Sequence, residues 1–393
     1  MARVAMLVRN PFTHDTRVEK EARTLREASY EVTVVADAAP GLPLRERRDG
    51  VDVVRVPRPL PGVPLARFVA HARTLRRQLL ALRPDVVHAH DSDALGPAAA
   101  AAHELTVPLV YDAHDLWLGR PRRGRGRFYF ALNQLWFGWL ESRLIPRAAA
   151  WITVSAPIAR HLERRYRVGP VELVPNYPEI TEERVSRRTI RDLPAAAEIP
   201  SSAPIVLYLG GLMAGRGIEH LVAAVPLIDR EAHLVLLGAG GQARELADLA
   251  ARHGVALRVH LADLVPSDEL NVIAASANVG VSPIVGTSQN YRYSLPNKLF
   301  QYMAAGLPVV ASNFPQVREV VEGSGAGLCV DTADPAALAA AIDTILADRG
   351  LAAEMGAAGR AAVEDRYNWD VAAETLLGVY ARVLGQAPLE SGR

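Results

Sequence analysis

The 393-residue sequence is poor in cysteine and in lysine. Its single cysteine, Cys329, excludes a disulfide framework and a cysteine-rich metal centre. Of the 44 lysines and arginines, Lys20 and Lys298 are the only lysines, so arginine is the usual basic residue of this chain. Because lysine presents a compact ammonium where arginine presents a planar fork, a lysine retained in such a chain indicates a position that needs a point charge.

Long hydrophobic runs are also missing. No stretch reaches the about 18 apolar residues expected of a membrane-spanning helix. The opening segment "MARVAMLVRN" has an apolar region too short for a secretory signal peptide. Half of the residues are hydrophobic and the formal net charge is +1. We therefore expect a globular protein located in the cytoplasm, and the length predicts two domains of ordinary size.

The small net charge conceals an uneven distribution. Residues 1–180 hold 27 basic and 19 acidic residues, whereas the rest of the chain holds 17 basic and 24 acidic residues. Seven arginines and no acidic residue occur in residues 53–84, and "RPRRGRGR" (120–127) adds five more arginines. The asymmetry predicts that the two halves meet different partners, and chance drift across a large surface is the alternative.

The segment "FYFALNQLWFGWLESRL", which follows these arginines, places large apolar residues near helical spacing. Basic and aromatic residues together predict contact with an anionic or lipid-linked acceptor at the inner face of the membrane. The alternative is a packed amphipathic helix beside a solvated loop. Because no recognition motif accompanies the positive charge, we expect no nucleic-acid partner.

Short apolar runs alternate with helical periodicity along the chain, which predicts parallel sheets with helices on both faces. Two such series predict two doubly wound domains, at residues 1–174 and 204–368. Residues 175–203 are rich in proline and charge and are predicted to be a linker. A helix is expected at 369–385, before a tail at 386–393. The expected strands are "VAMLV", "EVTVVA", "PDVVHAH", "PLVYDAH" and "WITVS", then "PIVLYLG", "HLVLLGAG", "LRVHLA", "NVGVSPI" and "PVVAS".

The segment "SLPNKLFQYMAAGLPVVAS" (294–312) is the most informative motif. We expect Ser294 to cap a helix that carries Pro296 in its first turn and ends at Gly306. The free N–H groups of that first turn, with Lys298 beside them, form a site suited to an anion such as a diphosphate. The alternative for Lys298 is a solvated surface lysine.

Three further loops of the second half follow predicted strands. "LYLGGLMAGRGIEHL" (207–221) combines glycines with Arg216 at the start of a helix, as a phosphate-binding loop does, although a flexible loop with a solvated arginine is the alternative. "VLLGAGGQARELADLAARHG" (235–254) lacks the third glycine of a dinucleotide fingerprint, so an ordinary tight turn is favoured. "HLADLVPSDEL" (260–270) offers backbone groups to a flat base.

The first half places His88, His90 and Asp91 at the end of one predicted strand. His114 and Asp115 follow the next strand along the chain. A metal cluster is conceivable at these positions. Histidines on one face of a strand are more often core or cleft residues, so we expect no metal.

As an ensemble, these segments resemble the retaining glycosyltransferases of the GT-B fold, glycosyltransferase family 4 (glycosyl transferases group 1). "GGLMAGRG", "HLVLLGAGG" and "SLPNKLFQYMAAGLPVVAS" are similar to donor-domain motifs of that family. "NPFTHDTRVEKEARTL", "VVHAHDSDAL" and "VYDAHDLW" are similar to its acceptor-domain segments. The resemblance implies an α/β fold of two Rossmann-like domains facing across a cleft, with the C-terminal helix crossing back to the first domain. It also implies sugar transfer from a nucleotide diphosphate sugar with retention, without metal or other cofactor.

The resemblance places Arg216 at the family's lysine position and His114 near the donor sugar and the acceptor. With Lys298 as the second cation, we expect these three residues to be catalytic. The donor-binding positions that it implies are Gly210, Gly211, Gly215, Gly238, Leu264, Tyr293, Ser294, Leu295, Asn297 and Gln301, and the acceptor-binding positions are Asp15, Arg17, His90, Asp91 and Asp115. The chain departs from the family where Tyr293 and Gln301 replace a pair of glutamates and where Gly211 replaces an arginine. A nucleotide-sugar 2-epimerase and a nucleotide-binding protein without catalysis are the alternatives.

Overall fold

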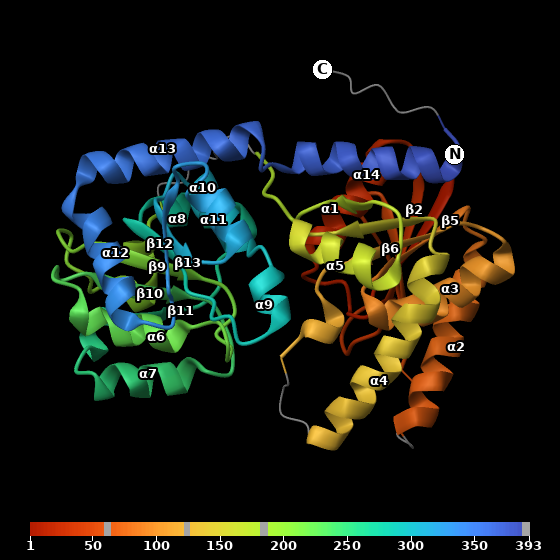
Figure 1. The fold of residues 1–393 in the computed structure, drawn as a ribbon, viewed down its shortest axis with the longest axis horizontal. Coiled ribbons are helices and arrows are strands. Elements are labelled where there is room, and N and C mark those ends of the chain that lie inside the picture. Colours follow the sequence, from red (N-terminus) through yellow and green to blue (C-terminus); the bar gives the residue numbers. More distant parts are fainter. Residues whose placement is uncertain (59–63, 122–125, 181–187, 387–393) are drawn as a thin grey trace. The chain divides into compact units, whose positions relative to one another are not determined.

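The computed structural model describes residues 1–58, 64–121, 126–180 and 188–386, and it divides into two compact units (Figure 1). The first unit combines Met1–Asn176 with Asp370–Arg393. The second unit is Tyr177–Trp369. The C-terminal helix therefore belongs to the first unit, as expected for a chain that crosses back after its second domain.

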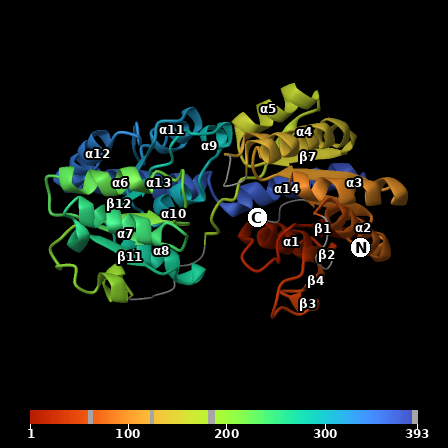
Figure 2. The ribbon, with the colours of Figure 1, turned by 90° about the horizontal axis from the view of Figure 1, so that it is seen from below.

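The first unit is built on an eight-stranded sheet. Its neighbouring strands are parallel except for β3 and β4, which pair antiparallel. In Figure 2 the labels β3, β4, β2 and β1 rise in that order toward β7. The order across the sheet is β3 (Arg45–Arg48), β4 (Val51–Val56), β2 (Glu31–Asp37), β1 (Arg3–Leu7), β5 (Val86–His90), β6 (Leu109–Ala113), β7 (Ala150–Thr153) and β8 (Val171–Leu173).

Helices of the first unit connect its parallel strands, as right-handed crossovers require in a doubly wound sheet. They are α1 (Thr16–Glu27), α2 (Pro64–Leu82), α3 (Ser92–Leu105), α4 (Arg127–Leu144) and α5 (Ala156–Tyr166), joined by α14 (Trp369–Leu384) from the end of the chain. No helix among the described residues is long and apolar enough to cross a bilayer.

The second unit is built on a six-stranded parallel sheet. Its order is β11 (Val259–Ala262), β10 (His233–Leu237), β9 (Ile205–Leu209), β12 (Val279–Ser282), β13 (Val309–Ser312) and β14 (Gly327–Val330). Its helices are α6 (Ile218–Ala224), α7 (Ala243–Arg252), α8 (Ser267–Ala275), α9 (Gln289–Tyr293), α10 (Asn297–Ala304), α11 (Pro315–Val321), α12 (Pro335–Ala347) and α13 (Arg349–Asp365).

The central strand β9 shows why an unbroken apolar run is needed. Successive side chains of a strand point to opposite faces of the sheet. Ile205, Leu207 and Leu209 pack into one hydrophobic cluster, whereas Val206 and Tyr208 pack into the cluster on the other face. All five are buried because helices cover both faces of the sheet.

Each sheet reverses its strand order at one point. In the first sheet the reversal lies between β1 and β5, and in the second it lies between β9 and β12. Ligands of open α/β sheets bind beyond the carboxyl ends of the strands at such a point. We therefore expect ligand sites at the loops after β1 and β5 in the first unit and after β9 and β12 in the second.

The ten strands predicted from the sequence and the two doubly wound sheets are confirmed. The hairpin of β3 and β4 was not predicted, although Asp49 and Gly50 form a typical tight turn between these strands. Residues 188–200 differ from the expected linker, because Ile190, Leu193 and Ile199 are buried in the core of the second unit.

Candidate functional site

A polar pocket of about 150 Å³ opens at the carboxyl edge of the first sheet. The chain leaving β1 contributes Asn10 and Asp15, and the end of β5 contributes His90 and Asp91. His114 follows β6 and is also part of the polar lining. This pocket lies at the point where the strand order reverses, as expected for a ligand site.

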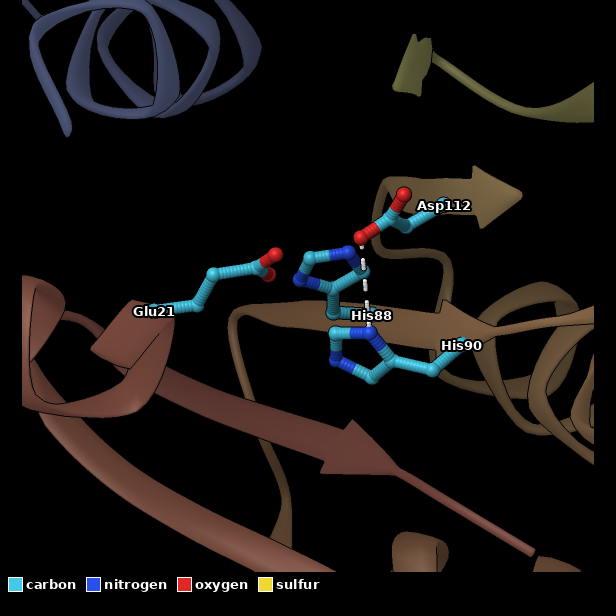
Figure 3. Close-up of side chains that lie close together, drawn as sticks. All are labelled: Glu21, His88, His90 and Asp112. Carbon is cyan, nitrogen blue, oxygen red and sulfur yellow. Dashed lines mark ion pairs between the residues drawn. The ribbon is translucent and has the colours of Figure 1, made fainter. Parts of the chain in front are cut away.

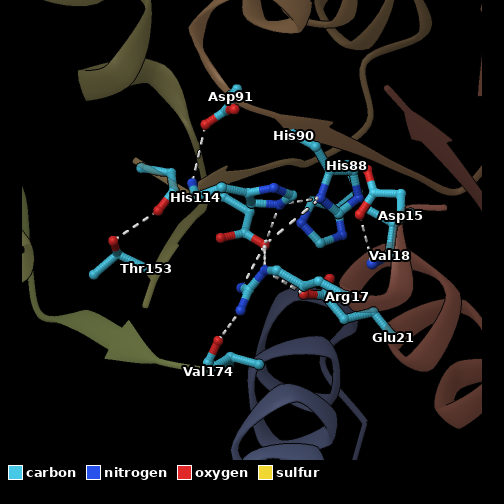
Figure 4. Close-up of polar contacts among 12 residues, drawn as sticks. Asp15, Arg17, Val18, Glu21, His88, His90, Asp91, His114, Thr153 and Val174 are labelled. Atoms are coloured by element: carbon cyan, nitrogen blue, oxygen red, sulfur yellow. Dashed lines mark hydrogen bonds and ion pairs between the residues drawn. The ribbon is translucent and has the colours of Figure 1, made fainter. Parts of the chain in front are cut away.

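A buried ionic network supports the floor of this pocket (Figure 4). Arg17 on α1 donates from Nη2 to Oδ2 of Asp112 over 2.7 Å, and its Nε lies 3.0 Å from Oε1 of Glu21. Its Nη1 donates to the carbonyl oxygen of Val174. Arg17 is 4% exposed and is not among the residues that line the pocket, and it holds Asp112 and Glu21.

His114 is a cationic group of the pocket, beside Arg9 and Arg120 in its lining. Its Nε2 lies 3.0 Å from Nδ1 of His90 and 3.3 Å from Oδ2 of Asp112. Burial lowers the pKa of His114, but the charge of Asp112 and its hydrogen bond outweigh burial and raise the pKa to about 9. Burial lowers the pKa of His90. At neutral pH, a protonated His114 therefore donates from Nε2 toward a neutral His90 and ionised Asp112.

Four buried side chains of this network also have the composition of a metal site. The ligand atoms of Glu21, His88, His90 and Asp112 all lie within 4.8 Å of one another (Figure 3). Two imidazoles and two carboxylates suit a metal such as zinc. However, the guanidinium of Arg17 already bridges both carboxylates. A metal ion would add positive charge beside it, so we interpret the cluster as an ionic network held by Arg17.

Asp91 holds the rim of the pocket in a strained conformation. Its φ of 65° and ψ of 167° lie in a region that residues other than glycine rarely adopt, at a cost of about 1–3 kcal/mol. Oδ1 accepts from the backbone N–H of His114 over 3.0 Å, and Oδ2 accepts from Arg120 over 2.9 Å. Arg120 also pairs with Asp115 and stacks 3.9 Å from the Trp117 ring centroid. In this conformation the Asp91 carboxylate lies between the His114 backbone and the Arg120 side chain.

Some of the predicted acceptor-binding residues line the pocket, and others lie beside it. His90, Asp91 and Asp15 line the pocket together with His114. Asp15 is also the N-cap of α1 and accepts from the Val18 N–H. Asp115 lies beside the pocket as a partner of Arg120, which lines it.

The second unit carries a separate cationic site at its own reversal point. Lys298 lies in the first turn of α10 and is 8% exposed. Its Nζ lies 3.5 Å from the Tyr208 ring centroid and 3.6 Å from where a Cβ would stand on Gly210. Burial and then the charge of Arg216 hold the pKa of Lys298 well below its usual value. Within the described part of the chain, neither cation has an ion-pair partner.

Close backbone approach brings the neighbouring loops to this site. A Cβ on Gly238, after β10, would stand 1.9 Å from the carbonyl oxygen of Gly210, after β9. Gly210 also has a φ of 116°, which strongly favours glycine. Both positions therefore require glycine for backbone reasons, whatever their role toward a ligand. Gly211 and Gly215 lie in the same loop, with Gly215 against the Tyr291 ring and Arg216 stacked 5.6 Å from that ring centroid.

The start of the lysine-bearing helix differs from the sequence prediction. Ser294 does not cap it, because its backbone N–H closes α9 on Asn290 and its hydroxyl donates to the Tyr291 carbonyl. The helix α10 begins at Asn297, and no side chain caps its N-terminus. Leu295 is buried in the core. The physical reason is that residues 289–293 form a helix of their own, which uses Ser294 as its end.

The remaining donor-binding candidates surround these loops. Tyr293 ends α9 and is half-buried, Asn297 is exposed at the start of α10, and Gln301 is half-buried one turn after Lys298. Leu264 follows β11, and 63% of its surface is exposed. The structure therefore gathers the loops after β9, β10 and β12, with Lys298 as the best-defined group.

Sequence reasoning missed several groups of the first unit. Asp112, Glu21 and Tyr380 were not singled out, although an acidic residue inside the apolar strand "LVYDA" and the four-residue spacing of Arg17 and Glu21 were available signals. The hydroxyl oxygen of Tyr380 on α14 lies 2.9 Å from Nδ1 of His88. Asp93 also lines the pocket, and burial together with the charge of Asp91 raises its pKa to about 7.

Two Rossmann-like units, each with a polar site at its strand-order reversal, fit the GT-B fold. The family models for Glycosyltransferase Family 4 and Glycosyl transferases group 1 match residues 15–177 and 203–348. The chain belongs to this family. It is 30% identical to a glycogen synthase of Mycobacterium tuberculosis, over 76% of this chain and 69% of the relative.

Two further similarities extend over most of the chain. A D-inositol 3-phosphate glycosyltransferase of Xylanimonas cellulosilytica is 28% identical, over 92% of this chain and 89% of the relative. The solved structure of Anabaena HepE in complex with UDP-glucose superposes with a TM-score of 0.76 at 17% identity, covering 97% of this chain and 100% of the other. The structural match supports the same fold.

Proposed function

We propose that the protein transfers a sugar from a nucleoside diphosphate sugar to an acceptor with retention of anomeric configuration and without a metal ion. The observation that carries this proposal is the pair of cations in the second unit. Lys298 is buried, Arg216 is close enough to lower its pKa, and neither has an anionic partner among the described residues. Two uncompensated cations at a sheet reversal suit a diphosphate. The HepE structure in complex with UDP-glucose supports this donor class.

In this proposal the cations act on the leaving group. As the glycosidic bond breaks, its electron pair stays on the diphosphate oxygen, and Arg216 and Lys298 stabilise that negative charge. The acceptor hydroxyl oxygen forms the new bond to the anomeric carbon on the same face, and its proton passes to a phosphate oxygen. The reaction therefore needs no side-chain base and no metal ion.

The first unit supplies the acceptor site in this proposal. The protonated imidazole of His114 has an Nδ1 without a partner in the described part of the chain, so this N–H is available to a hydroxyl or phosphate of the substrates. His90, Asp91 and Asp15 provide further polar groups around the acceptor. Asp112 and Arg17 act as positioning residues because they contact His114 and the pocket floor from below.

A nucleotide screen tests the donor class. UDP, GDP, ADP and dTDP are each added to the purified protein with EDTA, and the melting temperature is measured. We expect one nucleoside diphosphate to raise the melting temperature in EDTA, since Lys298 and Arg216 replace the metal. The Lys298→Met variant should lose this shift. If no nucleotide stabilises the wild type with or without Mg²⁺, the donor proposal is wrong.

The matching nucleotide sugar then separates transfer from isomerisation. NMR of the donor without acceptor should show the sugar unchanged, whereas an epimerase would convert it. A protein that binds the nucleotide but neither transfers nor epimerises would be catalytically inactive. The anomeric coupling of the transferred sugar reports retention directly.

Gln301 is expected to contact the donor ribose. Gln301→Leu should weaken donor binding by about 1–3 kcal/mol, because the ribose hydroxyls lose a partner. Gln301→Glu restores a carboxylate that accepts with two oxygens and should maintain or improve affinity. Calorimetric titration with the nucleotide measures both variants. Unchanged affinity in Gln301→Leu would place this residue outside the donor site.

A further inference from the structure

An exposed apolar stripe runs along α4 in the first unit. The residues in it are large and lie three or four positions apart, so they share one face of the helix. The stripe consists of Tyr129 (48% exposed), Leu132 (50%), Leu135 (71%), Trp136 (43%) and Trp139 (55%). On α2, the Phe68 ring packs edge-on to Trp136 with the centroids 6.3 Å apart, which joins the two helices into one surface. We call these residues the α2–α4 face.

The stripe is not the side by which α4 packs on its domain. The opposite side buries Phe137, Leu140 and Glu141. Glu141 accepts hydrogen bonds from the hydroxyls of Ser92 and Tyr166, and the Phe137 ring lies 4.9 Å from the Trp117 ring. Since the helix is already anchored through this inner side, the sequence alternative of a packed amphipathic helix does not account for the exposed stripe.

The two helices that carry the α2–α4 face also carry positive charge. α2 contains four arginines and no acidic residue, and α4 has Arg127 and Arg143 near its two ends. Arg67, Arg73 and Arg77 are exposed, whereas Arg76 pairs with Glu104. The acidic residue of α4, Glu141, is 4% exposed and faces inward. The exposed side of the two helices is therefore apolar and cationic without acidic groups of its own.

We propose that the α2–α4 face docks on an anionic lipid bilayer. Trp and Tyr side chains prefer the boundary between headgroups and acyl chains, and arginines around them attract anionic headgroups. A second copy of the same face would bring arginine against arginine, so the charge disfavours a symmetric dimer there. This inference rests on the first unit alone and does not depend on the donor site of the second.

The test is sedimentation of the full chain with vesicles of phosphatidylcholine or of phosphatidylcholine mixed with phosphatidylglycerol. We expect binding to the mixed vesicles that weakens with added salt and little binding to the neutral ones. The double variant Leu135→Ser and Trp139→Ser should lose binding at least about tenfold, because its apolar contact is removed. Arg73→Gln with Arg77→Gln should lose about tenfold or more, since each basic residue adds a factor of about five at an anionic surface.

Leu257→Ser is the matched control, because Leu257 is 86% exposed in the second unit and should have no effect on vesicle binding. Unchanged melting temperatures show that the surface variants remain folded. Equal sedimentation of the wild type with neutral and anionic vesicles would overturn the proposal. A second result would also overturn it. In that case light scattering shows that the wild type is a dimer and that the Leu135→Ser and Trp139→Ser variant is a monomer, while vesicle binding is the same for both.

Discussion

Replacing Lys298 with alanine is expected to lower turnover by about 100-fold or more, the magnitude typical for loss of one preorganised charge at a transition state. Arg216→Ala should have a comparable effect. In the proposed mechanism the diphosphate gains negative charge as the bond breaks, so each cation should help the transition state more than the bound donor. The turnover number should therefore fall further than donor affinity, and steady-state kinetics with calorimetry measures both.

Thermal stability is expected to change in the opposite direction from turnover when the charge of Lys298 is removed. Burial places the Lys298 ammonium away from water, with its charge against Arg216 and no anion among the described residues to balance it. Lys298→Met retains the apolar stem and removes the charge, so we expect an unchanged or higher melting temperature together with lost turnover. A residue that served only to hold the fold would show the reverse pattern.

The pH dependence of donor binding follows from the same burial. The pKa of Lys298 in the free protein is below its unfolded value, so the unfolded chain binds this proton more tightly and Lys298 destabilises the fold at pH values below its unfolded pKa. A bound diphosphate favours the protonated lysine. Donor affinity should therefore weaken as the pH rises through the lowered pKa, and this dependence should vanish in Lys298→Met.

The control for these variants must be an exposed cation away from the carboxyl ends of the strands. Lys20, the other lysine, is unsuitable because it is 8% exposed within α1. Arg252 is exposed in the last turn of α7, which runs back toward the amino-terminal start of β11. Arg252→Ala should retain turnover and donor affinity. If Lys298→Ala behaves like Arg252→Ala, Lys298 does not act on the donor.

Local patterns predicted the sheets because parallel strands that are covered on both faces are mainly apolar. The same logic predicted the loops that carry Lys298, Arg216 and His114, since parallel strands end at one edge of a sheet. The scarcity of lysine directed attention to Lys298, and the structure shows it buried beside Arg216. The amino-acid composition and the spacing of apolar residues were sufficient to predict these features.

Contacts between distant segments could not be predicted in this way. Arg17 meets Asp112 across 95 residues, and His88 meets Tyr380 across 292 residues. Such pairs depend on how the sheet assembles and not on any local spacing. The prediction of where α10 begins failed for a different reason. Two helix starts competed for residues 288–297, and Ser288 caps the first of them by accepting from the Tyr291 N–H.

Asp112→Asn is expected to destabilise the first unit by about 3–5 kcal/mol, because it leaves the buried charge of Arg17 without its closest anion. The residue is fully buried, and burial raises its pKa while Arg17 and His114 lower it well below the usual value. Asparagine preserves the shape, so the loss reports charge and not packing. The transition of the first unit is followed by hydrogen exchange of the β5 and β6 amides, which separates it from unfolding of the second unit.

The same substitution should also change the charge of the pocket. In the wild type, the pKa of His114 is raised to about 9, so its stabilising contribution is complete below its unfolded value of about 6.5 and disappears as the pH rises through 9. Without the Asp112 charge, burial is no longer outweighed and the His114 pKa should fall. NMR titration of the His114 ring measures this directly, and activity should then be lost at lower pH than in the wild type. His161 is the internal control, because burial and then the charges of Arg165 and Arg164 lower its pKa without any contribution from Asp112, so its titration should be the same in Asp112→Asn and in the wild type. A His114 pKa that remains near 9 in Asp112→Asn would show that Asp112 does not set the charge of this pocket.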